Sequence, residues 1–124
     1  MHVFEGKQAV EELGWLLDST VTGLALHADA YGGLVLEATC IPRADKPVRE
    51  LRMRFTEVTR FDFVWTSEQA FFFVPGYKAL LLESGSVYVS LDPYDDRARV
   101  PDTRDGCVIE ARSVRTESVL KSDP

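Results

Sequence analysis

The sequence is poor in the residues that most often carry catalysis or bind metals. It contains only two histidines and two cysteines in 124 residues. It has no CxxC pair, no phosphate-binding glycine loop and no GxSxG nucleophile motif. His27 and Cys40 would form a nucleophile–base pair only if the fold brought them together, and we interpret both as structural. We therefore predict a protein that is not an enzyme, with no catalytic residues, no metal and no cofactor.

Long apolar runs and a basic surface are also missing. No stretch approaches the ~20 apolar residues that a transmembrane helix needs, and the N-terminus lacks the features of a signal peptide. The net charge of −6 disfavours nucleic acid, because phosphates require a positive surface. We therefore expect a cytoplasmic protein that binds neither membranes nor nucleic acid. Cys40 and Cys107 lie in apolar runs and are expected to be reduced core residues.

The chain has the size and composition of one ordered domain. Hydrophobic residues make up 45% and charged residues 27% of its 124 positions, which is typical of a globular protein. Two domains of half this length would each bury too little surface. We predict a single domain over residues 1–115, followed by a polar tail over 116–124 that frays.

One helix and a series of strands follow from the hydrophobic pattern. Val10, Leu13 and Leu17 recur at helical spacing, and Asp18-Ser19 ends that helix. Alternating patterns then predict strands at 22–28, 34–41, 48–55, 59–65, 69–74, 79–83, 86–91 and 107–114. Parallel units are excluded because no crossover helices separate the strands. The expected fold is mostly β: an antiparallel, strongly bent sheet, a sandwich or open barrel of about eight strands with one N-terminal helix.

The densest polar cluster follows the strand that begins at Val87. We call residues 92–105 the acidic loop, since it holds five aspartates and three arginines. Its D-x-x-D-D spacing does not fit a calcium loop, so no metal is expected. The loop is either a solvated connection or a contact surface for a partner protein. The candidate contact residues are Asp92, Tyr94, Asp95, Asp96 and Asp102.

Aromatic residues gather in two neighbouring predicted strands. They are Phe61, Phe63, Trp65 and the run Phe71-Phe72-Phe73. Core packing explains them most simply. A subunit interface is one alternative, and the other is a small β-barrel that binds an apolar ligand in a cavity lined by Phe61, Phe63, Phe71 and Phe73. The basic positions Arg49, Arg52, Arg54 and Arg60 are interpreted as a solvated strand face.

Three segments carry a resemblance to a known group of proteins. They are Leu16-Leu17-Asp18-Ser19, Leu51-Arg52-Met53-Arg54-Phe55-Thr56-Glu57-Val58, and Tyr88-Val89-Ser90-Leu91-Asp92-Pro93-Tyr94-Asp95 with the later Cys107-Val108-Ile109-Glu110-Ala111 strand. In these segments the chain resembles small bacterial β-rich proteins, some of which are similar to the immunity proteins that accompany polymorphic toxins. The histidine of the group's first element is Leu17 here, so no role is carried over to that position.

The resemblance implies a non-enzymatic, protein-binding module that neutralises a partner by occlusion. Its partner would be a basic protein such as a cognate toxin. Asp92, Tyr94, Asp95 and Asp96 would then be contact residues, with charge attraction speeding the encounter and Tyr94 holding the complex. Whether the chain also self-associates stays open at this stage.

Overall fold

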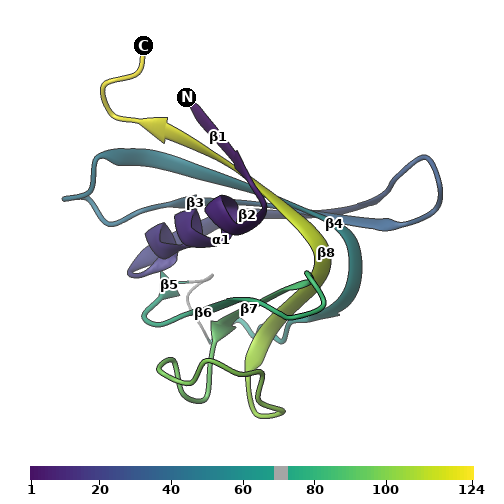
Figure 1. The fold of residues 1–124 in the computed structure, drawn as a ribbon. Coiled ribbons are helices and arrows are strands. Elements are labelled where there is room, and N and C mark those ends of the chain that lie inside the picture. Colours follow the sequence, from purple (N-terminus) through teal and green to yellow (C-terminus); the bar gives the residue numbers. More distant parts are fainter. Residues whose placement is uncertain (69–72) are drawn as a thin grey trace.

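The computed structural model describes residues 1–68 and 73–124 of the chain. Within these residues one antiparallel, strongly curled sheet has the strand order β5-β2-β3-β4-β8-β7-β6, and β1 also pairs with β8 (Figure 1). The strands are β1 (His2–Glu5), β2 (Ser19–Ala28), β3 (Leu34–Ile41), β4 (Val48–Asp62), β5 (Phe73–Val74), β6 (Lys78–Leu81), β7 (Val87–Asp92) and β8 (Gly106–Leu120). The predicted fold class, an antiparallel bent sheet of about eight strands with one N-terminal helix, is confirmed.

Strand β4 joins two segments that the sequence analysis separated. It runs for 15 residues, and the predicted break between 55 and 59 is an irregularity of its pairing with β8 between Val58 and Arg60. Glu57, beside this irregularity, has φ 50, the left-handed conformation. A bulge adds a residue to one strand and bends it without ending the ladder. The predicted break is therefore a bend within one strand, and it lets the sheet curl.

The prediction that a polar tail frays from residue 116 is wrong for residues 116–120. Strand β8 continues to Leu120, with β4 on one side and β1 on the other. Thr116 and Ser118 are buried, and Ser118 donates a hydrogen bond from Oγ to Glu12 Oε1 at 2.8 Å. The N-terminal strand β1, which the sequence pattern did not indicate, supplies one of the two partners. A polar strand is stable here because both of its edges are paired.

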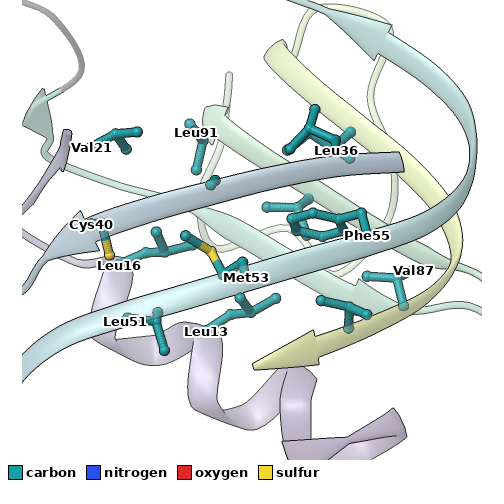
Figure 2. Packing of buried hydrophobic residues seen from close by; sticks show 14 of the residues in the cluster. Leu13, Leu16, Val21, Leu36, Cys40, Leu51, Met53, Phe55, Val87 and Leu91 are labelled. Carbon is teal, nitrogen blue, oxygen red and sulfur yellow. The ribbon is translucent and has the colours of Figure 1, made fainter. Parts of the chain in front are cut away.

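The helix covers the concave face of the sheet (Figure 1). It consists of α1 (Gly6–Glu12) and a 3-10 segment, η1 (Leu13–Leu16). Leu13 and Leu16 are fully buried against β3 and β4, as Figure 2 shows. The predicted core residue Leu17 is instead 47% exposed. The tighter 3-10 turn repeats every three residues, so Leu13 and Leu16 share the buried side and Leu17 points outward. Neither helical segment in the described ranges has the length and apolar content to cross a membrane.

Two predicted hairpins are present. The β2–β3 tip is ordered by Asp29, whose Oδ1 accepts hydrogen bonds from the amides of Tyr31 at 2.8 Å and Gly33 at 2.9 Å. The β6–β7 turn contains Gly85 at φ 87, a conformation that glycine adopts without strain. Of the predicted strand 69–74, β5 supplies Phe73 and Val74, and positions 69–72 lie outside the described residues.

Leu16→Ala and Leu17→Ala test this helical register. Leu16→Ala should lower the free energy of unfolding by about 2–5 kcal/mol, because it removes a fully buried side chain and leaves a cavity. Leu17→Ala should change it by less than about 0.5 kcal/mol, as expected for an exposed position. Urea unfolding of both variants measures the difference. Equal losses would mean that Leu17 belongs to the core.

Candidate functional site

The acidic loop covers one face of the β6–β7–β8 end of the sheet. Along β7, Val87, Val89 and Leu91 belong to the main core beneath α1, so Tyr88 and Ser90 point to the opposite face. Both of these are nevertheless fully buried. The alternation of apolar and polar residues in β7 is typical of a half-buried strand, but both of its faces are buried because the loop closes over the second one. Beneath the loop, Tyr88 packs in a small cluster of its own with Leu80 and Val108.

A buried ion pair fixes the loop to the sheet. Lys78 Nζ lies 3.0 Å from Asp105 Oδ2 and 3.2 Å from Oδ1, and neither side chain has any exposed surface. The ammonium group also donates to the Val100 carbonyl at 3.0 Å. Burying two charges is costly unless each is satisfied by further hydrogen bonds. Lys78 meets this condition through contacts with two separate positions of the loop.

Asp105 joins the two ends of the loop. Its carboxylate accepts hydrogen bonds from Tyr88 Oη at 2.6 Å, from the Tyr94 amide at 3.0 Å and from the Asp102 amide at 3.1 Å. Burial alone would raise the pKa of Asp105, but these hydrogen bonds and Lys78 lower it below its ordinary value. Asp105 is therefore an ionised acceptor at neutral pH. Burial and the hydrogen bond to Asp105 raise the pKa of Tyr88 to about 12, so its phenol remains a donor.

Tyr94 is presented to solvent on this support. It is 61% exposed, although its amide is held by Asp105. The Arg104 guanidinium lies 3.6 Å from the centroid of the Tyr94 ring. Arg104 in turn donates to both carboxylate oxygens of Asp102, at 3.0 and 2.8 Å. The ring is thus stacked on Arg104 in the free protein, and such pre-organisation would reduce the entropy cost of binding.

Four of the five predicted contact residues meet in one place. Asp92, Tyr94, Asp95 and Asp96 line a surface depression of about 310 Å³. Its other walls are Pro75, Gly76 and Pro93. Among the residues that the structure describes, the carboxylates of Asp92 and Asp96 have no ion-pair partner, and the Asp95 carboxylate accepts only the Arg97 amide, at 3.0 Å.

The fifth predicted residue, Asp102, is not part of this depression. Arg104 donates to it from both its side chain and its amide, which holds the pKa of Asp102 at about 2. Its charge is therefore already neutralised by a neighbour. Asp102 helps to position Arg104 beneath Tyr94 and is a supporting residue of the loop.

The sequence analysis missed Lys78, the residue on which the loop rests. Asp105 was counted in the acidic cluster but given no role, and Lys78 was placed outside the predicted strand at 79–83. One signal was available. Lys78 alternates with Leu80 in a short apolar strand, and a lysine at the buried spacing of such a strand requires a buried acidic partner.

The His27–Cys40 pair considered from sequence does not form. In the β2–β3 ladder His27 pairs with Val35, and Cys40 pairs with Val21. Because Val21 lies six residues from His27 along β2, Cys40 and His27 are separated by roughly 20 Å. His27 is exposed, whereas Cys40 is buried, which raises the pKa of its thiol to about 11. Both cysteines are free. Across residues 1–68 and 73–124, no three His, Cys, Asp or Glu side chains are grouped to hold a metal ion.

Of the aromatic residues considered for a ligand cavity, those that the structure describes do not share one interior space. Phe61 and Phe63 stack with centroids 4.4 Å apart and pack against the main core. Phe73 is 54% exposed, and Phe71 lies outside the described residues. The concave face that would hold a ligand is occupied by the buried residues of the helix, Leu13 and Leu16.

Removing the Asp105 charge tests the support of the loop. Asp105→Asn should lower the free energy of unfolding by about 3–5 kcal/mol, because it leaves the Lys78 ammonium buried without a counter-charge. Adding Lys78→Met to this variant should recover part of the loss. Asp102→Asn, which breaks an exposed pair, should cost less than about 1 kcal/mol. Equal losses for Asp105→Asn and Asp102→Asn, measured by urea unfolding, would contradict the role of the buried pair.

The same pair predicts an acid dependence of stability. Because the pKa of Asp105 is lower in the folded than in the unfolded chain, its contribution is complete above the unfolded pKa of about 3.9. It is lost as pH falls through the folded pKa. The difference in stability between the natural chain and Asp105→Asn should therefore be constant near neutrality and narrow below about pH 4. A difference that stays constant down to about pH 2.5 would contradict this assignment.

Comparisons with known proteins identify no relative of this chain. No protein-family model, curated protein or solved structure matches the chain.

Proposed function

We propose that this protein is a non-enzymatic binding module that docks the acidic loop onto a basic surface of a partner protein and neutralises that partner by occlusion. The observation that carries the proposal is that a buried ion pair holds the exposed surface of the acidic loop in place. Asp105 and Lys78 hold the loop, and Tyr94 with three carboxylates is displayed on its outer side. Loops on a rigid scaffold are the usual position of binding residues.

The charge of the depression favours a cationic partner. Asp92, Asp95 and Asp96 stand around it, and the chain as a whole carries −6. An acidic patch attracts a basic protein over roughly the Debye length, ~8 Å at physiological salt, and raises the association rate. A lysine or arginine of the partner would enter the depression between these carboxylates. Such an interaction weakens with added salt.

Tyr94 provides the apolar part of the contact. Tyrosine and arginine are enriched among the residues that dominate binding energy, and here Tyr94 and Arg104 already form one stacked unit. Because the unit is ordered in the free protein, little side-chain entropy is lost on binding. The closest functional analogy is an immunity protein that covers the active site of a toxin. Action in the cytoplasm, where both cysteines stay reduced, belongs to the same proposal.

Charge reversal in the depression tests the proposal. Asp95→Lys combined with Asp96→Lys should abolish capture of the partner from a lysate of the native cell at low salt, because it places two cations against a basic surface. The measurement is the set of proteins retained, identified by mass spectrometry. A partner retained by the natural chain should be eluted by raised salt.

A matched variant separates the loop from total charge. Glu11→Lys combined with Glu83→Lys makes the same change in net charge at two exposed positions outside the loop, and should retain the partner. A basic protein that binds the natural chain and this control but not the loop variant supports the proposal. If all three chains retained the same proteins, the acidic loop would not be the surface that binds the partner.

A further inference from the structure

Two arginines face each other on the side of the sheet that does not contact the helix. Arg54 lies between the core residues Met53 and Phe55 in β4, so it points to the opposite face. The β4–β8 register places it directly against Arg115. Like charges in this position are unfavourable in a sheet.

Carboxylates stand at the two ends of this row. Glu37 of β3 pairs with Arg54, and Glu5 of β1 pairs with Arg115. Four strands therefore contribute one row in the order carboxylate, guanidinium, guanidinium, carboxylate. Its centre, between the two arginines, is the most positive point of the row.

The two guanidinium groups are only partly satisfied by their neighbours. Arg54 contacts Glu37 through one nitrogen at 3.2 Å, and Arg115 contacts Glu117 through one nitrogen at 3.5 Å. Arg52, two residues away on the same face, is held by Glu50 through two nitrogens, at 3.1 and 3.4 Å. All three arginine side chains are 48% exposed. Arg54 and Arg115 thus keep more free donors than an arginine of equal exposure beside them.

Two depressions of the surface meet at this pair. One, of about 200 Å³, and another, of about 400 Å³, are each lined by both Arg54 and Arg115. The larger also contains Thr56 and Ser113, which are paired in the β4–β8 ladder and whose hydroxyls hydrogen-bond to each other. A hydroxyl pair of this kind has one hydrogen left to donate. Cationic and neutral donors therefore line the same recess, together with the Glu5 carboxylate and Gly6 at the start of α1.

We propose that Arg54 and Arg115 form a binding site for a divalent oxyanion, the phosphoryl group, with the Thr56 and Ser113 hydroxyls at its side. Two planar guanidinium forks match the charge and the oxygens of such a group. A bridging dianion would also remove the repulsion between the arginines. Glu5, Glu37 and Glu117 flank the pair and would repel an anion that does not lie between the two arginines. Arg115 is seven residues along β8 from Val108, which the acidic loop covers, so the two sites are separate.

Titration with inorganic phosphate at constant ionic strength tests the proposal. The side-chain Nε–H resonances of Arg54 and Arg115 should shift and saturate together, and the midpoint of thermal unfolding should rise with phosphate. Arg54→Gln and Arg115→Gln should each weaken binding at least tenfold. Arg112→Gln, at an exposed arginine that lines neither depression, should leave it within twofold. Shifts that do not saturate, or an equal loss in Arg112→Gln, would overturn the site and indicate general screening.

Two further arms complete the experiment. Arg54→Lys keeps the charge but loses the planar fork, so it should weaken binding to an intermediate degree, and it serves as the test if Arg54→Gln fails to fold. Titration with phenyl phosphate, at the same ionic strength, distinguishes a phosphate ester from the free ion by which of the two saturates the arginine resonances at lower concentration. Saturation by neither compound overturns the proposal.

Discussion

The buried pair of Lys78 and Asp105 is the interaction on which the acidic loop depends. An ion pair without solvent gains stability only when the remaining donors and acceptors are also matched. Here the surrounding partners are Tyr88, two loop amides and the Val100 carbonyl. Every one of these except Tyr88 belongs to the loop. The cost of burying the charges is therefore offset only when the loop is closed. The order of the exposed loop surface thus depends on this buried ion pair.

Curvature of the sheet makes such a support available. The long strands β4 and β8 bend together, and the helix fills the concave side with Leu13 and Leu16. With that side occupied, polar residues and recesses lie on the outer face, where the loop covers one end and the paired arginines occupy another. The chain thus uses its inner face for stability and leaves its outer face for contacts.

The fold was largely predictable from sequence, whereas the support of the site was not. Alternation of side chains reports which segments are strands, and it located the β2–β3 hairpin and the core of β4, β7 and β8. It could not report that a bulge lies between Val58 and Arg60 or that Thr116 and Ser118 are buried, because both depend on partners distant in sequence. The exposed residues of the loop were recognised by their density of charge. Lys78 was not, since a single lysine identifies a buried pair only after its partner is placed.

Pairing within the loop determines where its free charge lies. Asp105 is neutralised by Lys78 and Asp102 by Arg104, so neither contributes to the outer surface. The unpaired carboxylates that remain are those around the depression. A loop of five aspartates and three arginines is nearly balanced as a whole, yet its free negative charge is concentrated beside Tyr94. The internal ion pairs convert it into a small acidic recess with an aromatic wall, which is the geometry that a basic side chain of a partner would require.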